Sequence, residues 1–161
     1  MTTILDFLCT LPDVSDRALD MLEASGFAGL PVEWNPRLRT TAGRAHYRKA
    51  LGMPAVPVKI DLNLSLRTEG PEAIKKTFLH ELAHVIAGRD AKHGPRWKAI
   101  CRQLGGTGER CHNYKSMHAQ QNAGKLVGVC ERCGFKVIRA RKLMAGRTYT
   151  HPRCGGKIIS S

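Results

Sequence analysis

The chain has 161 residues, of which 42% are hydrophobic and 24% are charged, and its formal net charge is +13 at pH 7. This composition excludes disorder throughout and predicts one globular domain with a small appendage. No stretch approaches the roughly 20 apolar residues of a membrane span. No signal peptide is apparent, because Asp6 interrupts the short apolar run near the N-terminus. We therefore expect a cytoplasmic protein without membrane contact.

The excess positive charge lies in the second half of the chain. Residues 1–84 contain ten Lys and Arg and ten Asp and Glu, whereas residues 85–161 contain sixteen Lys and Arg and three acids. This asymmetry predicts a polyanionic partner, most simply nucleic acid, with a basic face that only aids solubility as the alternative. The six cysteines, some at metal-binding spacing, indicate a reducing compartment rather than a disulfide framework.

The chain begins with helical patterns. Residues 13–25 form an amphipathic helix that Asp13 or Ser15 can cap and that Gly26 ends. Its apolar face consists of Val14, Ala18, Leu19 and Leu22. A shorter helix is expected over residues 2–10.

Three strands follow, over residues 30–35, 44–49 and 56–62. In the third, apolar side chains recur at every second position, which is the period of a strand with one buried face. A small sheet therefore precedes the next helix. An edge strand of that sheet could hold an extended peptide by backbone pairing.

The next helix begins at Pro71, ends at Gly88 and carries the motif HExxH at residues 80–84. Histidines four residues apart lie on one face of a helix, so both imidazoles can bind one metal ion. The adjacent carboxylate of Glu81 can take a proton from water. This pattern, in an apolar helical context, is typical of zinc metallohydrolases.

Three histidines are the predicted ligands of a catalytic zinc ion: His80, His84 and His93. Three nitrogen ligands leave a fourth position open, as catalytic zinc sites do. Asp90 is a rival third ligand, since acidic ligands occur in other HExxH enzymes. Glu81 is the predicted general base for hydrolysis of a peptide bond. The residue that stabilises the oxyanion is not identified.

Another helix is expected from Pro95 to Leu104, followed by a polar linker or loop over residues 105–124. Its buried face is predicted to contain Trp97, Ile100, Cys101 and Leu104. Cys9 and Cys101, both in apolar helical contexts, are expected to be buried. Three further histidines have no second metal-binding residue at a recognisable spacing: His46, His112 and His118. We expect them to be ordinary polar residues.

A second ligand set lies near the C-terminus and consists of Cys130, Cys133, His151 and Cys154. Glycine follows each pair, at Gly134 and Gly155, as expected for two tight knuckles. Four ligands without an open position predict a structural zinc ion, which can fold a segment too small for its own core. If His151 does not bind, Cys111 is a candidate in its place.

The segment around this second set is the most basic part of the chain. Residues 125–161 contain nine Lys and Arg, against Glu131 as the one acid. Phe135 and Tyr149 lie among these basic residues, an arrangement that suits single-stranded nucleic acid, whose bases can stack on aromatic rings. The alternative is that the rings form the small core of the segment. We therefore expect an α+β fold, with a catalytic domain over residues 1–122 and a β zinc ribbon over residues 123–161.

Four motifs of this chain belong together: Trp34-Asn35-Pro36-Arg37-Leu38 with Thr41-Ala42-Gly43, Ile60-Asp61-Leu62-Asn63, the HExxH motif, and His93-Gly94 with Trp97. With them the chain resembles the SprT-like metalloproteases, the group that includes Spartan, over roughly residues 30–156. A zinc ribbon after the protease domain is similar to the bacterial SprT layout. The sequence departs from that pattern at His151, where a cysteine is more usual.

The resemblance implies a zincin-like fold with His80, His84 and His93 as zinc ligands and Glu81 as catalytic base. Spartan-type members cleave proteins crosslinked to DNA and are stimulated by DNA. Protein substrates and DNA, with single-stranded character, are thus the expected partners, and a bacterial or phage source is expected. Two alternatives remain: a nucleic-acid-binding protein whose zincin domain is only a scaffold, and a peptidase without a DNA role.

Overall fold

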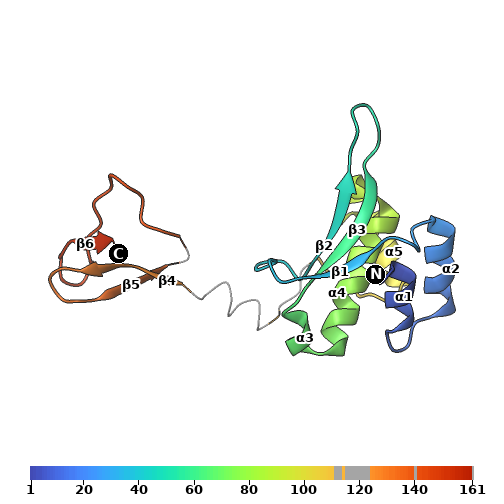
Figure 1. Cartoon of the computed structure of the whole chain (residues 1–161), viewed down its shortest axis with the longest axis horizontal. Helices are drawn as coiled ribbons and strands as arrows, with labels where there is room; N and C mark the ends of the chain where they lie inside the picture. Colours follow the sequence, from blue (N-terminus) through green and yellow to red (C-terminus); the bar gives the residue numbers. More distant parts are fainter. Residues whose placement is uncertain (111–113, 115–123, 140, 161) are drawn as a thin grey trace. The chain divides into compact units, whose positions relative to one another are not determined.

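A computed structural model covers the chain and describes residues 1–110, 114, 124–139 and 141–160 (Figure 1). The chain divides into two compact units, Met1–Met117 and His118–Ser161. The domain boundary expected after residue 122 lies outside the described residues, as do Cys111, His112 and His118. Among the described residues, no helix is long and apolar enough to cross a membrane.

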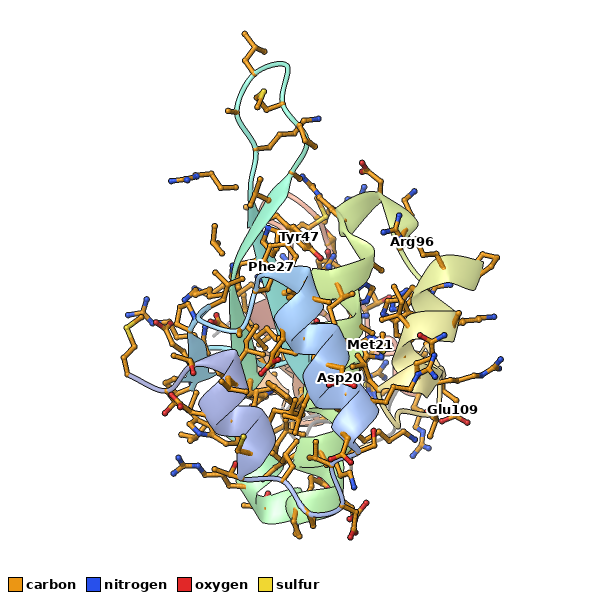
Figure 2. The ribbon with its side chains drawn as sticks, turned by 90° about the vertical axis from the view of Figure 1, so that its right-hand side faces the viewer. Asp20, Met21, Phe27, Tyr47, Arg96 and Glu109 are labelled. Atoms are coloured by element: carbon orange, nitrogen blue, oxygen red, sulfur yellow. The ribbon has the colours of Figure 1, made fainter. Side chains whose placement is uncertain are left out.

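The first unit contains a three-stranded sheet in the order β1-β3-β2 (Figure 1). Its strands are β1 (Val32–Asn35), β2 (Gly43–Arg48) and β3 (Val56–Asn63). β1 runs parallel to β3, whereas β2 is antiparallel to β3. These strands confirm the predicted ones within two residues at each end. The loop between β2 and β3 projects from the body of the unit (Figures 1 and 2).

The helix α4 (Pro71–Ala87) packs against β2, β3 and the helix α5 (Pro95–Gln103). Pro71 occupies the first turn of α4, where a missing N–H costs nothing. Gly88 follows the last turn with a φ of 85°, a backbone angle that residues with a side chain rarely adopt. Both predicted boundaries of this helix are confirmed, and the HExxH motif lies in its second half.

The described part of the first unit also contains four shorter helical elements: α1 (Ile4–Cys9), α2 (Asp16–Ser25), α3 (Leu66–Glu69) and the 3₁₀ turn η1 (Arg89–Ala91). Ser15 caps α2 by accepting a hydrogen bond from the Ala18 N–H, and Gly26 ends the helix with a φ of 74°. Sequence analysis did not predict α3 or η1, because elements of three or four residues are too short to show a helical period.

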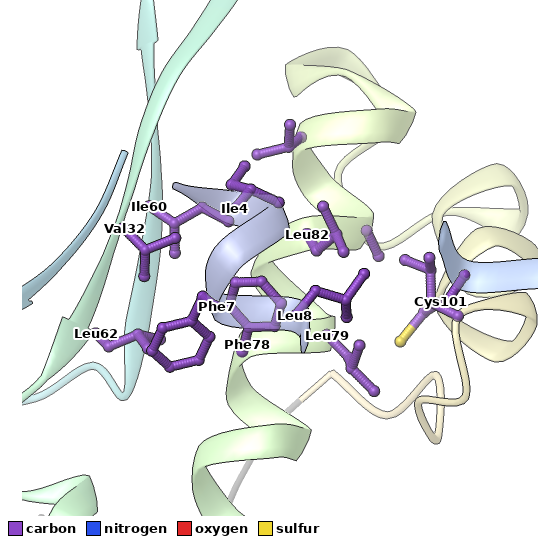
Figure 3. Packing of buried hydrophobic residues seen from close by; sticks show 14 of the residues in the cluster. Ile4, Phe7, Leu8, Val32, Ile60, Leu62, Phe78, Leu79, Leu82 and Cys101 are labelled. Carbon is purple, nitrogen blue, oxygen red and sulfur yellow. The ribbon is translucent and has the colours of Figure 1, made fainter. Parts of the chain in front are cut away.

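The core of this unit lies between the sheet, α1, α2, α4 and α5 (Figure 3). The ring of Phe7 from α1 lies 4.6 Å from the ring of Phe78 in α4 and 6.1 Å from that of Trp34 in β1. Cys101 is buried as expected, but the prediction for Cys9 is wrong because its side chain is exposed. In α1 the buried positions are Ile4, Phe7 and Leu8, and Cys9 lies outside that face.

The second unit contains a small antiparallel sheet in the order β5-β4-β6. Its strands are β4 (Lys125–Cys130), β5 (Lys136–Arg139) and β6 (Ile158–Ser160). Its few buried side chains among the described residues include Val127, Cys130 and His151. The protein is therefore a mixed α+β structure whose C-terminal unit has little apolar core of its own.

Candidate active site

Three imidazole rings converge in the first unit, two from α4 and one from the segment that follows η1. The Nε2 atom of His93 lies 3.1 Å from the Nε2 atom of His80 and 3.1 Å from that of His84. Zinc bound tetrahedrally to nitrogen separates its ligand atoms by about 3.3 Å. The three nitrogens thus fit a single small cation, and the described residues supply no fourth ligand to it.

Asp90, the rival third ligand, is not part of this group. It lies in η1 and lines a separate cavity. The structure therefore brings His93, and not Asp90, to the two histidines of α4.

The indole ring of Trp97 in α5 packs against the imidazole rings of all three histidines. Its side chain is fully buried, and its ring centroid lies 4.6 Å from those of His80 and His93 and 5.2 Å from that of His84. The Trp97 indole N–H also donates a hydrogen bond to the carbonyl oxygen of His80, at 3.4 Å. A rigid indole thus fixes the directions of the three imidazoles before any ion binds.

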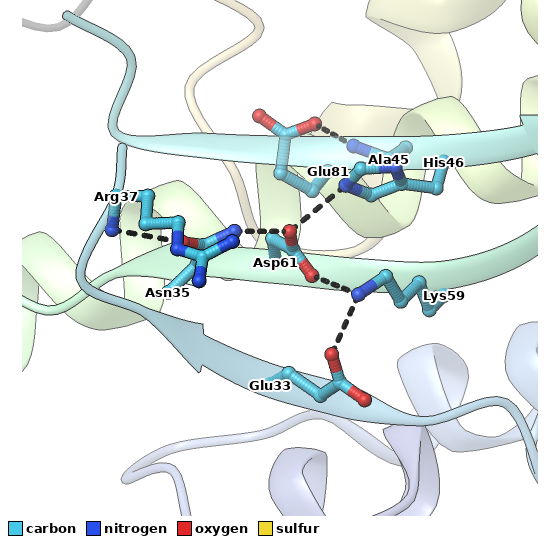
Figure 4. A network of polar contacts seen from close by, with 8 residues as sticks. All are labelled: Glu33, Asn35, Arg37, Ala45, His46, Lys59, Asp61 and Glu81. Carbon is cyan, nitrogen blue, oxygen red and sulfur yellow. Dashed lines mark hydrogen bonds and ion pairs between the residues drawn. The ribbon is translucent and has the colours of Figure 1, made fainter. Parts of the chain in front are cut away.

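Glu81 lies beside the imidazoles, and strand β2 holds its carboxylate. The backbone N–H of Ala45 donates a hydrogen bond to Glu81 Oε2 at 2.9 Å (Figure 4). A Cβ atom on Gly43 would lie 2.7 Å from Glu81 Cγ and 2.9 Å from Thr77 Cγ2. Only glycine lets β2 approach α4 so closely, which gives a physical reason for the glycine at position 43.

Burial raises the pKa of Glu81 to about 7, although the Ala45 hydrogen bond and the positive charge of Arg44 act in the opposite direction. Burial also lowers the pKa of His84 to about 4, with a smaller contribution from His93. The pKa of His93 is lowered as well, first by burial and then by Arg110. The imidazoles of His84 and His93 are therefore neutral near pH 7, as metal binding requires.

Tyr47, which is labelled in Figure 2, makes a second contact between β2 and α4. Its hydroxyl donates a hydrogen bond of 2.7 Å to the carbonyl oxygen of His84. Burial, followed by the charge of Glu81, raises the pKa of Tyr47 to about 12, so the hydroxyl remains a donor. Sequence analysis missed this residue, because its role depends on where β2 crosses α4.

A polar network ties the three strands together and includes His46, which we expected to be an ordinary polar residue. The carboxylate of Asp61, only 1% exposed, accepts a hydrogen bond from the Asn35 amide at 2.7 Å and lies 2.9 Å from His46 Nε2 (Figure 4). Lys59 forms ion pairs with Asp61 and Glu33 at 3.0 and 2.6 Å. Burial raises the pKa of Asp61, but the combined effect of these partners is larger. The pKa therefore lies below its ordinary value.

This network could have been found in the sequence from polar residues at alternating positions of an otherwise apolar strand, Lys59 and Asp61. It explains why the resemblance motifs of β1 and β3 contain Asn35 and Asp61. The network positions β2, and β2 in turn holds Glu81.

The second ligand set also converges, in the C-terminal unit. His151 Nδ1 lies 3.1 Å from Cys154 Sγ and 3.3 Å from Cys133 Sγ, and Cys130 Sγ lies 3.5 Å from Cys154 Sγ. Two thiolates on tetrahedral zinc are about 3.8 Å apart, so these slightly shorter distances fit one shared ion. The histidine offers Nδ1 here, whereas the first site uses Nε2.

Two knuckles of the same shape hold these four residues. Gly134 and Gly155 both have a φ of 68°, and their N–H groups donate to the carbonyl oxygens of Cys130 and His151, at 2.9 and 2.8 Å. Burial opposes ionisation of Cys130, but hydrogen bonds from the backbone of Cys133 and Arg132 outweigh it and lower the pKa of this thiol. At Cys130 both features favour binding of a metal by a thiolate.

Phe135 lies in contact with this group yet faces solvent. Its ring stacks on the His151 ring with centroids 4.5 Å apart and an angle of 11°, and 51% of the side chain remains exposed. The structure thus does not bury Phe135 in a core. Tyr149 is partly buried, with the Arg139 guanidinium 6.0 Å from its ring centroid.

Comparison with known proteins places the first unit in a family. The sequence model of the SprT-like family matches residues 15–120. The chain belongs to the SprT-like family. It is 32% identical over 130 residues to a SprT-like protein of Streptococcus sanguinis strain SK36, which covers 78% of this chain and 79% of that protein. A SprT-like protein of Staphylococcus aureus strain JH9 is 30% identical over 129 residues, 78% of each chain.

A longer relative is the germ cell nuclear acidic-1 protein of Caenorhabditis elegans, 29% identical over 163 residues. The alignment covers 89% of this chain but 28% of that protein. The predicted family is thus confirmed, and the matched segment contains all three histidines and Glu81. The SprT-like family is metallopeptidase-related, and both Cys/His groups could hold a metal ion. The Cys/His group of the second unit lies outside the residues that the family model matches.

Proposed function

We propose that the protein is a zinc-dependent endopeptidase with a zincin-like fold that cleaves DNA-bound or DNA-crosslinked proteins. The observation that carries the proposal is the convergence of His80, His84 and His93 in one cavity with Glu81. In this proposal the three histidines bind the catalytic zinc ion. Cys130, Cys133, His151 and Cys154 bind a second, structural zinc ion.

The residues of the first site have distinct roles in the proposed hydrolysis. A zinc ion held by three imidazoles supplies Lewis acidity, which lowers the pKa of water and polarises a carbonyl group. Glu81 takes a proton from the attacking water and passes it to the leaving amine. The hydrogen bond from Ala45 fixes one carboxylate oxygen and leaves the other to carry the proton. Tyr47 and Trp97 keep the His84 backbone and the imidazole rings in place.

Charge and exposure in the second unit support a DNA partner. Among the side chains of this unit that the structure describes, eight basic ones are exposed: Arg132, Lys136, Arg139, Arg141, Lys142, Arg147, Arg153 and Lys157. The exposed face of Phe135 offers a stacking surface among them. Exposed aromatic rings among basic side chains are typical of proteins that bind single strands. We infer that the second unit binds DNA with single-stranded character, in a bacterial or phage-infected cytoplasm.

Substitution of the proposed base tests the enzyme. Glu81→Gln keeps the hydrogen-bond acceptor for Ala45 but removes the base, so cleavage of a DNA-bound protein should fall by about 10²- to 10⁴-fold. Zinc content, measured by atomic emission, should not change. Glu23→Gln removes an exposed carboxylate of α2 and should keep full activity. Cleavage by Glu81→Gln at the wild-type rate would refute the mechanism.

The same assay, run with and without single-stranded DNA, distinguishes the alternatives. If zinc-loaded wild-type protein binds DNA but cleaves neither itself nor a bound protein under either condition, the first unit is a scaffold of a nucleic-acid-binding protein. If cleavage is independent of DNA, and DNA binding does not weaken steeply with salt, the protein is a peptidase without a DNA role.

A further inference from the structure

We propose that the active-site cavity selects a peptide segment with acidic side chains next to the scissile bond. The proposal rests on the proposed peptidase function and adds a substrate class to it. Arg44, Arg89, Lys92 and Arg110 are the residues that we assign to substrate selection.

The cavity that contains the catalytic residues has a volume of about 540 Å³ and is strongly basic. The four basic residues named above line it, and all four are exposed. Among the described residues that line it, the one carboxylate is that of Glu81, which is 8% exposed and held by Ala45. Positive charge therefore dominates the surface that a substrate meets, and a zinc ion would add to it.

Among the described residues, none of these four side chains forms an ion pair with a carboxylate, although the charge of Arg44 acts on Glu81 from a distance. The ion pairs found there between a basic and an acidic side chain involve Lys59, Lys76 and His46. None involves a basic residue of the cavity, although Asp90 directly follows Arg89 in the sequence. Clustered like charges repel one another, so an anionic ligand in the cavity would relieve that repulsion.

The basic residues reach the cavity from separate parts of the chain. Arg44 lies in β2, Arg89 in η1, Lys92 directly before His93, and Arg110 beyond α5. A solvated basic face of a single helix does not have this arrangement. Because the charges come from several segments around the catalytic residues, they can contact substrate residues near the bond that reacts.

A peptide suits this cavity better than a nucleic acid does. The bond to be hydrolysed must reach Glu81 and the three histidines, which line the same cavity as the basic residues. A phosphate backbone bound there would occupy the position of the peptide and block the reaction. The exposed basic side chains of the second unit offer a nucleic acid a separate surface.

The expected preference is moderate and salt-dependent. An exposed ion pair changes an equilibrium by a factor of up to about five. Two acidic side chains should therefore favour a peptide by roughly tenfold over an uncharged one. Salt at 0.5 M should remove most of this preference, because it screens charges exposed to solvent.

Three labelled peptides of equal length test the proposal, with Glu, Ser or Lys on both sides of the same central bond. The first measurement is the kcat/KM of zinc-loaded wild-type protein for each peptide. The second is binding of each peptide to zinc-loaded Glu81→Gln protein by fluorescence anisotropy, which does not depend on turnover. We expect the order Glu, Ser, Lys in both.

Charge-removing variants locate the preference. Arg89→Gln with Lys92→Gln should reduce the advantage of the Glu peptide at least threefold in both measurements, at unchanged zinc content. The matched control is Arg17→Gln, an exposed arginine of α2 that does not line the cavity, and it should keep the advantage.

The outcomes separate this proposal from the proposed function. Equal cleavage of the three peptides, or a preference that survives the double substitution, overturns the acidic-segment proposal while the peptidase function stands. Preferential binding of the Glu peptide without cleavage supports the cavity preference and overturns the peptidase function. A single-stranded oligonucleotide that displaces the Glu peptide, and that the double substitution weakens equally, would show a nucleic-acid site and overturn the proposal.

Discussion

The two ligand groups of this chain are supported in opposite ways. In the first unit, two of the three histidines lie on α4 and the third lies in the segment after η1. Their rings pack against the fully buried Trp97, and the unit has a large apolar core. The four residues of the second unit are held by two tight knuckles on a small sheet with few buried side chains. The first site is thus formed by the protein fold, whereas the second unit has few buried side chains among its described residues, and we expect it to need a bound metal ion to fold.

This difference matches the chemistry proposed for each site. An open site must keep its geometry while substrate and water exchange, so rigid support from Trp97, Ala45 and Tyr47 is required. A closed four-ligand site has no exchanging position and can itself serve as the core of its unit. Four predictions test this contrast, and they are arranged from the largest expected effect to the smallest.

Metal removal should unfold the second unit and spare the first. Structural zinc in small domains binds with an apparent free energy of about 10–16 kcal/mol. A chelator should therefore make residues 124–160 accessible to protease, whereas residues 1–110 stay resistant, as mass spectrometry of the fragments can show. Cys133→Ser should reproduce this result without chelator, and His93→Ala should leave both units folded. If residues 124–160 resisted protease without metal, the second unit would not depend on its metal for folding, and the proposed difference between the two units would be wrong.

The preformed first site should carry a pH-dependent cost in the metal-free protein. The pKa of Glu81 rises from 4.5 to about 7 on folding, so the folded state holds a proton that the unfolded state has lost between these values. The free energy of unfolding of the wild type, relative to Glu81→Gln, should therefore fall by about 3 kcal/mol between pH 4.5 and 7. Urea unfolding of both proteins in the presence of a chelator measures this difference in unfolding free energy. The pH-dependent contribution of His84 is the same in both proteins and cancels. A difference that is constant with pH would contradict the prediction.

Close approach of β2 to α4 should be essential to the first site. Gly43→Ala places a methyl group 2.7 Å from Glu81 Cγ, so it should cost about 1–3 kcal/mol of unfolding free energy and displace Glu81. Urea unfolding and cleavage assays should both detect the change. The control is Gly29→Ala, because nothing lies within 4 Å of the added Cβ there, and it should change stability by less than about 0.5 kcal/mol. Equal effects of both substitutions would rule out the steric argument.

The smallest effect is expected from the Tyr47 hydroxyl. Tyr47→Phe leaves the His84 carbonyl without this donor and should cost about 0.5–1.5 kcal/mol of unfolding free energy, with reduced cleavage and unchanged zinc content. Tyr149→Phe removes a hydroxyl of the second unit that accepts a hydrogen bond from the Met144 N–H at 3.3 Å. That substitution should leave the first unit unaffected. If Tyr47→Phe were neutral in both assays, Tyr47 would have no positioning role.

Much of the two ligand groups could be predicted because their spacing is local. An i, i+4 pair on a helix and a Cys-x2-Cys knuckle each bring two side chains together within one turn of backbone, whatever the rest of the chain does. Helix ends were also local, as the glycines at positions 26 and 88 show with their positive φ angles. Cys9 was mispredicted because six residues of helix bury only a narrow face.

The sequence by itself therefore determined the family, the main helices and strands and the residues that can bind metal. Only the tertiary structure decided how β2 meets α4: Gly43 by close approach, Ala45 by its N–H and Tyr47 by its hydroxyl. It also decided that His46 pairs with Asp61 and that four basic residues from separate segments surround one cavity. The hydrogen bonds among these contacts join residues 15 to 37 positions apart, so they follow from strand register and helix packing, which no local pattern encodes.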